Sequence, residues 1–192
     1  MNKLFFIEGL WGTGKTRICL YLKKEFRFYY IKELNHIKGG LSGKSRKNIT
    51  HWYLKEHIKN LNKGLDLLSA GRNVIIERSP ISSVAFINTF FSKDNSFDLK
   101  VSYFEELLKG LQQAPHVVYI ESVNIGKLAR HMKGVPYIFD YANLHLLRML
   151  NSNFVNYMSK LKKKRLIKLT KVKSDISPEG FKKTIQINKY EN

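Results

Sequence analysis

The sequence predicts an α/β protein in which a five-stranded parallel sheet is covered by helices on both faces. Short apolar runs alternate along the chain with segments whose apolar residues recur at helical spacing, which is the pattern of parallel strands joined by crossover helices. A glycine-rich loop, GLWGTGKT at residues 9–16, separates the first strand from the first helix. A length of 192 residues fits one compact domain with a sizeable core, so we expect residues 1–192 to form a single domain.

The first half of the chain begins with a strand, a loop and a helix, and repeats this alternation. We expect strands at 4–8, 28–34 and 73–77, and helices from the loop to Phe26, at 50–70 and at 82–91. The run at 4–8 is apolar and ends at Gly9. Apolar residues between 50 and 70 recur at helical intervals, and Gly71 then supplies a C-terminal stop.

The second half of the chain continues the alternation without an internal repeat or a clear linker. We expect a helix at 101–111, a strand at 116–121, helices near 125–132 and 140–161, a strand at 166–169 and a last short helix. Ser177, Pro178 and Glu179 form the start signal of that last helix, because proline and an acid are favoured in a first helical turn.

The charge balance is strongly basic, with 34 Lys and Arg against 15 Asp and Glu and a net charge of +19. Such a balance favours polyanionic partners such as nucleotides, nucleic acid or anionic membrane. The densest basic run, from Lys160 to Lys173, is either a nucleic-acid patch or a solvated helix end that leads into the strand at 166–169. We favour the second interpretation, so nucleic acid remains an alternative partner.

The single cysteine and the hydropathy pattern indicate a cytoplasmic protein. Cys19 lies among apolar residues, which suits a small buried hydrophobe, and one cysteine excludes an intramolecular disulfide. The apolar run at 4–7 is too short for the core of a signal peptide. No stretch approaches the roughly 20 apolar residues of a membrane span, so we expect no membrane partner.

The loop at residues 9–16 carries the complete pattern G-x-x-x-x-G-K-[ST] between a predicted strand and a predicted helix. Glycines allow successive backbone N–H groups to face one anion, and the following helix adds the positive end of its dipole. Lys15 would reach the outer phosphates of a nucleotide, and the hydroxyl of Thr16 would ligate Mg²⁺. The pattern therefore predicts ATP and Mg²⁺ as cofactors. A similar stretch at 39–45 lacks the first glycine and a preceding strand, so we expect no second loop of this kind.

The whole chain resembles the thymidylate kinase family, with features of the related deoxynucleoside kinases. The resemblance rests on FIEGLWGTGKT (6–16), on Lys32-Glu33-Leu34 with Gly39-Gly40-Leu41, on AGRNVIIERSPISSVAF (70–86), on Pro115 to Glu121 and on Lys127 to Lys133. It implies the three-layer fold of P-loop kinases with a short lid at about 133–140. It also implies phosphoryl transfer from ATP to a deoxynucleoside monophosphate, with dTMP first among the acceptors, and a homodimer.

The resemblance also implies the roles of individual residues. Catalytic roles fall on Lys15, Glu33, Arg78 and Arg130, the last as a cation that moves onto the phosphates, helped by Arg17, Lys127 and Lys133. The nucleotide would be held by Gly9, Gly12, Thr13, Gly14, Lys15, Thr16 and Arg17, and the metal by Thr16 and by Glu77 through a water. The acceptor would contact Trp11, Glu33, Tyr53, His57, Arg78 and Ser82, with Tyr53 or Trp52 stacked on its base.

Three positions depart from the thymidylate kinase pattern and bear on the identity of the acceptor. Trp11 stands where many members have an acid, Ile87 where the family often has a glutamine, and Ser79 where it has a tyrosine. The sequence Glu-Arg-Ser at 77–79 resembles the motif of deoxynucleoside kinases. If the protein is similar to those enzymes in activity, Glu33 would act as general base toward a nucleoside 5′-hydroxyl. A deoxynucleoside kinase is therefore the first alternative, and a nucleic-acid-binding P-loop ATPase is the second.

Overall fold

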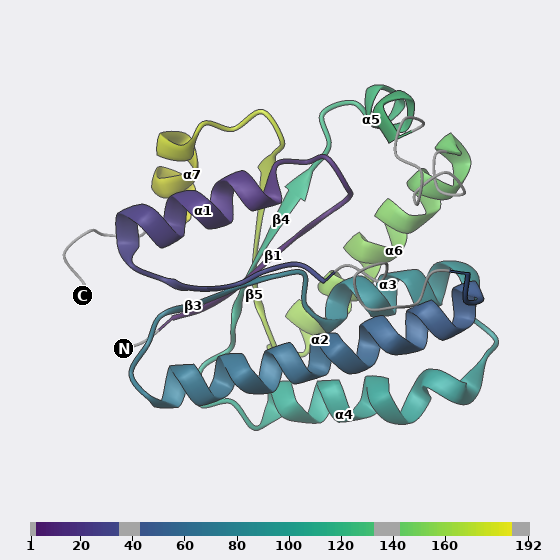
Figure 1. Ribbon diagram of the computed structural model, residues 1–192, viewed down its shortest axis with the longest axis horizontal. Helices are drawn as coiled ribbons and strands as arrows, with labels where there is room; N and C mark the ends of the chain where they lie inside the picture. The colour runs from purple at the N-terminus through teal and green to yellow at the C-terminus, as the bar shows by residue number, and fades with distance from the viewer. Residues whose placement is uncertain (1–2, 35–42, 133–142, 186–192) are drawn as a thin grey trace.

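The computed structural model describes residues 3–34, 43–132 and 143–185, which form a parallel sheet with helices on both faces (Figure 1). The strands are β1 (Leu4–Gly9), β2 (Tyr29–Ile31), β3 (Val74–Glu77), β4 (His116–Glu121) and β5 (Lys168–Lys173). Their order is β2-β3-β1-β4-β5, and every neighbouring pair is parallel. The predicted α/β class with five parallel strands is confirmed, and β1 lies at the centre of the sheet.

The helices divide between the two faces of this sheet. They are α1 (Lys15–Phe26), α2 (Arg46–Ser69), α3 (Pro80–Phe90), α4 (Asp98–Lys109), α5 (Ile125–Met132), α6 (Leu144–Lys163) and α7 (Pro178–Ile185), with a 3₁₀ turn at Asn95–Phe97. Helices α1 and α7 cover one face, and α2, α3, α4 and α6 cover the other (Figure 1). Local signals set two of the starts: the Ser45 hydroxyl caps α2, and the Ser79 hydroxyl caps α3 ahead of Pro80.

Two strands differ from the sequence-based expectation. Strand β2 covers only residues 29–31 of the predicted 28–34. The last strand lies at 168–173 and not at 166–169, because Leu166 and Ile167 are buried in the connection after α6, where Arg165 has a φ of 57°. Strand β5 pairs with β4 alone and is an edge strand. It therefore lacks the continuous apolar run that is typical of an interior strand.

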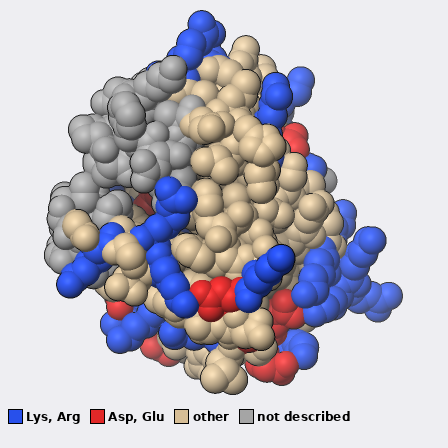
Figure 2. Space-filling view, turned by 90° about the vertical axis from the view of Figure 1, so that its right-hand side faces the viewer, with Lys and Arg blue, Asp and Glu red and all other residues tan. Residues whose placement is uncertain are grey.

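The lysine run at 160–173 ends α6 and continues into β5, as the favoured interpretation predicted. Lysines on an exposed edge strand discourage pairing with the edge of another sheet. Elsewhere too the surface is rich in basic groups: Lys and Arg side chains project around the margin of the face in Figure 2. Of the helices in the described ranges, none combines the length and the apolar character that a membrane crossing requires.

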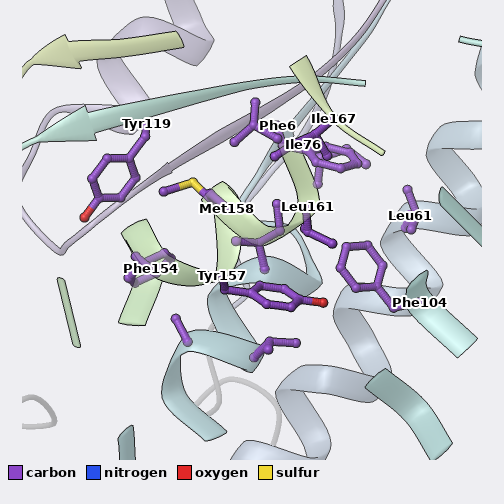
Figure 3. Close-up of a cluster of buried hydrophobic side chains, with 14 of the residues drawn as sticks. Phe6, Leu61, Ile76, Phe104, Tyr119, Phe154, Tyr157, Met158, Leu161 and Ile167 are labelled. Atoms are coloured by element: carbon purple, nitrogen blue, oxygen red, sulfur yellow. The ribbon is translucent and has the colours of Figure 1, made fainter. Parts of the chain in front are cut away.

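The central strand distributes its side chains between two cores. Leu4 and Phe6 belong to the larger core, which fills the space between the sheet and helices α2, α3, α4 and α6 (Figure 3). Phe5 and Ile7 belong to a second core against α1 and α7. Cys19 is buried in the second core, in line with the prediction of a small buried hydrophobe. A strand buried on both faces in this way is typical of a parallel sheet, and it fixes the end of β1 rigidly.

Helix α4 offers a direct test of the larger core. Phe104 is 0% exposed within that core, whereas Leu99 on the same helix is 87% exposed. Phe104→Ala should lower the free energy of unfolding by about 3–5 kcal/mol, because it removes a buried ring and leaves a cavity. Leu99→Ala should change it by less than about 0.5 kcal/mol. Urea unfolding followed by circular dichroism measures both, and similar losses in the two variants would contradict the assigned packing of α4.

Candidate active site

The glycine-rich loop connects the carboxyl end of β1 to the start of α1, and its glycines are required by the backbone. Gly9 has a φ of 144°, and a Cβ atom there would lie 2.6 Å from the carbonyl oxygen of Ile120 in β4. Gly12 and Gly14 have φ values of 70° and 88°, in the left-handed region that glycine adopts without strain. Gly14 caps α1 without a side-chain hydrogen bond. The first N–H groups of α1 are therefore oriented toward a ligand position at the helix terminus.

Lys15 is folded into the loop. Its Nζ donates a hydrogen bond of 2.9 Å to the carbonyl oxygen of Leu10, and the Thr13 hydroxyl donates to the same oxygen at 2.8 Å. Burial lowers the pKa of the Lys15 ammonium to about 8. The ammonium therefore stays charged at neutral pH, and a nearby phosphate would stabilise the charged form further.

Thr16 and Glu77, the two residues predicted to hold a metal, are in contact beside the loop. The Thr16 hydroxyl donates a 2.5 Å hydrogen bond to Glu77 Oε1, and the Tyr30 hydroxyl from β2 donates to Glu77 Oε2. Mg²⁺ prefers hard oxygen ligands, keeps several waters and is often held by one or two protein groups together with substrate phosphates. The Thr16 hydroxyl and the Glu77 carboxylate are oxygen groups in contact, and Thr16 follows Lys15 directly in the sequence. The pair therefore fits this preference of Mg²⁺.

Arg78 follows β3 directly and points its guanidinium toward the loop. Its Nε donates to Glu33, and its Nη1 donates to the Gly9 carbonyl at 3.0 Å and to the Ser82 hydroxyl at 3.4 Å. Its Nη2 is buried and has no hydrogen-bond partner among the described residues. The side chain also lies over the Trp11 ring, 5.2 Å from its centroid. Arg78 thus spans the space between the loop and the predicted acceptor side.

The charges around Arg78 are mutually compensating. Burial alone would lower the pKa of Arg78, but Glu33 and the buried Glu8 raise it, so the guanidinium remains a cation. Burial would likewise raise the pKa of Glu33, but Arg78 and Lys15 outweigh it and lower that pKa. Glu33 is therefore an ionised carboxylate. It lies two residues beyond the end of β2, although the predicted strand ran on to residue 34.

Tyr53 and His57 share one face of α2, with their ring centroids 5.6 Å apart. The His57 Nδ1 lies 2.9 Å from the Ser83 hydroxyl, whereas its Nε2 is buried without a partner among the described residues. Burial and the nearby Arg78 lower the pKa of His57 to about 3. At neutral pH the imidazole is uncharged, so it can take part in a neutral hydrogen bond but cannot neutralise a phosphate.

Trp11 closes the predicted acceptor side with an apolar surface. Its ring meets Phe86 of α3 edge to face at 5.3 Å, and Arg78 lies over it. Ile87, at the position where the family often has a glutamine, packs instead with Leu54 and Ile58 in a small core.

Some predicted site residues lie apart from this network. Arg130 is exposed on α5 and is not among the contacts around the loop. Arg17 donates through its Nη2 to the carbonyl of Ile176, in the connection between β5 and α7. Ser82, by contrast, belongs to the network, because its hydroxyl accepts from Arg78 Nη1 and donates to Glu8 at 2.5 Å. The predicted lid at 133–140, Lys133 and the glycines at 39 and 40 fall outside the described residues.

Sequence reasoning overlooked two residues that organise the site. Tyr30 binds the predicted metal carboxylate Glu77, and Glu8 binds the residues that follow Arg78. The sequence could have indicated a structural role for Glu8, because an acid within an apolar central strand needs buried partners. It gave no such indication for Tyr30, since an aromatic residue in a strand is ordinary.

The lowered pKa of Lys15 predicts a pH dependence of nucleotide binding. The charged ammonium binds phosphate, so the Kd for MgATP should rise as the pH passes above about 8, and binding near that pH should take up a proton. Calorimetry in buffers of different ionisation enthalpy measures the uptake. In Lys15→Arg the guanidinium stays charged, so the uptake should vanish. An equal uptake in wild type and Lys15→Arg would contradict the assignment to Lys15.

No protein-family model matches this sequence, and no curated protein matches it either. Solved structures do resemble the fold. Deoxyadenosine kinase from M. mycoides with bound dATP has a TM-score of 0.69 at 14% identity, covering 95% of this chain and 97% of that chain. Thymidylate kinase from Candida albicans has a TM-score of 0.69 at 16% identity, covering 96% and 89%. YorR from Bacillus subtilis, in complex with phosphorylated GDP, has a TM-score of 0.60 at 17% identity, covering 96% and 94%. The chain therefore has the α/β fold that these proteins share.

Proposed function

We propose that the protein is an ATP-dependent kinase of deoxynucleotides, with dTMP as its acceptor and dTDP and ADP as its products. The observation that carries the proposal is the position of Arg78. The guanidinium is bound to the Gly9 carbonyl of the glycine-rich loop, is 4% exposed and keeps Nη2 available beside that loop. A buried cation between a triphosphate site and an acceptor crevice suits phosphoryl transfer, in which charge on the moving group must be neutralised.

The roles of the donor side follow from the loop geometry. The N–H groups at the start of α1 and the Lys15 ammonium would hold the β- and γ-phosphates. Thr16 and Glu77 would hold Mg²⁺, which supplies further neutralisation of the phosphate charge when bound. Gly9 keeps the loop close to β4, so the phosphates would be fixed relative to the sheet. The transfer would then depend mainly on alignment and on neutralisation by Lys15 and Arg78.

The acceptor side offers groups suited to a nucleotide. Tyr53 presents an aromatic face for stacking on a base, and the neutral His57 presents a buried Nε2 to a polar edge. The free Nη2 of Arg78 would bind the acceptor phosphate or the transferred group. Glu33 would help to place the sugar. The likeness in fold to the Candida albicans thymidylate kinase supports this choice of acceptor.

A second candidate is a deoxynucleoside kinase, which the ion pair between Glu33 and Arg78 favours. An ionised carboxylate at this position is suited to accept the proton of a sugar 5′-hydroxyl. The likeness in fold to the M. mycoides deoxyadenosine kinase supports this candidate. A nucleic-acid-binding ATPase is supported by the net charge and by the departures from the thymidylate kinase pattern, but the densest lysine run belongs to the end of α6 and to the edge strand β5.

A panel of deoxynucleosides and their monophosphates, assayed with MgATP by separation of the products, tests the proposal. We expect turnover of dTMP. Turnover of thymidine or deoxyadenosine without turnover of dTMP would replace the first candidate by the second. ATP hydrolysis that is stimulated by nucleic acid, with no small-molecule product, would overturn both. The predicted homodimer is tested separately by light scattering.

Arg78→Ala should lower the rate of phosphoryl transfer by about 10³-fold or more, because arginines that neutralise the transferred group contribute that much. The Kd for MgATP should change far less. Arg72→Ala is the matched control, since Arg72 is an exposed arginine in the connection between α2 and β3, at the opposite end of the sheet. A normal rate in Arg78→Ala would remove Arg78 from the catalytic residues.

Glu33→Gln separates the two candidate acceptors. A nucleoside hydroxyl must lose a proton, so loss of a general base should lower kcat by about 10²–10⁴-fold. The phosphate of a monophosphate is already largely ionised at pH 7, so its attack needs no base. With dTMP as acceptor, Glu33→Gln should therefore act mainly on KM. Steady-state kinetics with both acceptor classes measure this split, and a large loss of kcat on dTMP would contradict the placing role of Glu33.

A further inference from the structure

Glu8 is a fully buried acid in the central strand, one residue before the glycine-rich loop. Its Oε1 accepts hydrogen bonds from the backbone N–H and the hydroxyl of Ser79, both at 2.7 Å. Its Oε2 accepts a hydrogen bond of 2.5 Å from the Ser82 hydroxyl. The carboxylate therefore ties the end of β1 to the first turn of α3.

The same two serines adjoin Arg78, one in sequence and one through a hydrogen bond. Ser79 follows Arg78 directly, and its hydroxyl also caps α3 by accepting from the Ile81 N–H. The Ser82 hydroxyl accepts from Arg78 Nη1 while it donates to Glu8. The orientation of that hydroxyl is thus set by the carboxylate, because a donated proton leaves its lone pairs for the guanidinium.

The backbone at Arg78 needs such support. Its φ of 62° lies in the left-handed region, which is sterically unfavourable for a non-glycine residue. The N–H groups on both sides of this angle bind β1, from Arg78 to the Ile7 carbonyl at 3.1 Å and from Ser79 to Glu8 at 2.7 Å. A strained conformation persists only where its surroundings determine it in this way.

A carboxylate is an unfavourable choice for a position that serves packing alone. Taking an ionised group out of water is costly even when it is hydrogen-bonded, and a well-packed apolar residue is often as stable or more so. The hydrogen bonds to Glu8 are short and directed at the residues around Arg78, which points to a role in holding the guanidinium.

We propose that Glu8 is a positioning residue for Arg78, which it holds against the loop through Ser79 and Ser82. Only the expected effect on the reaction rate rests on the proposed function. The placement of Arg78 is a property of the protein itself, so it can be tested without substrate.

Nuclear magnetic resonance of protein labelled with ¹⁵N-arginine gives the substrate-free test. The Arg78 Nε–H donates to Glu33 from a buried position, so it should exchange slowly with water. Its signal is assigned by its loss in Arg78→Lys. Glu8→Gln keeps the side-chain volume and one acceptor oxygen but removes the charge, and the exchange should become faster by on the order of tenfold. An unchanged exchange rate in a folded Glu8→Gln protein would overturn the proposal.

Kinetics give the second arm, in a double-mutant cycle. Glu8→Gln should lower kcat by on the order of 10²-fold, as expected for a displaced catalytic group, and leave the KM for ATP within about twofold. In an Arg78→Lys background the same change should lower kcat by less than about twofold, because the placed group is already altered. Equal factors in the two backgrounds would show that Glu8 acts independently of Arg78 and would overturn the proposal.

Matched variants separate positioning from stability. Glu105→Gln removes the charge of an acid on α4 that binds Lys164 and Tyr157 away from the site, so it should alter stability without altering kcat.

Ser79→Ala is the variant to use if Glu8→Gln fails to fold. It removes the hydrogen bond from the Ser79 hydroxyl to Glu8 and leaves the hydrogen bond from the Ser79 backbone N–H. It should speed the Arg78 Nε–H exchange in the same direction but less, and no change would count against the proposal. Should no acceptor be turned over by the wild type, the proposed function fails while the exchange measurement still decides the role of Glu8.

Discussion

Parallel pairing of β1 with β3 is the constraint on which the candidate site depends. The register places Ile7 opposite Glu77, so the residues that follow each strand meet at one edge of the sheet. Gly9 of the loop then accepts a hydrogen bond from Arg78, and Thr16 donates to Glu77. Both strands are buried on their two faces, so their ends have little freedom. A slip of this pairing would separate the glycine-rich loop from Arg78.

The electrostatics of the site differ from those of the surface. The chain carries a net charge of +19, yet the buried cations Lys15 and Arg78 are surrounded by the carboxylates of Glu8, Glu33 and Glu77. Buried charges are tolerated only when they are paired and hydrogen-bonded, so this balance is a condition of folding. Among the described residues Arg78 Nη2 has no hydrogen-bond partner, and under the proposed function an anionic group of a substrate would bind it. The densest run of lysines lies elsewhere, at the end of α6 and on the edge strand β5.

Much of the fold was predictable because its signals are local and strong. The apolar strands β1, β3 and β4, the long helical spacing of α2 and the loop between β1 and α1 were all expected near their observed positions. The edge strands were less predictable, since β2 is only three residues long and β5 alternates lysines with half-buried residues. The burial of Leu166 and Ile167 next to β5 displaced the expected strand, because burial outside a strand gives the same apolar signal.

The sequence by itself determined the glycine-rich loop of this protein. Its glycines, lysine and threonine act through backbone angles and a helix terminus that adjacent residues create. The contacts that surround it were decided by tertiary structure, because their partners are far apart in the chain. Glu8 meets Ser79 and Ser82 more than seventy residues later, and Glu33 meets Arg78 forty-five residues later. No local pattern encodes such pairs. They arise only when parallel strands bring their ends together.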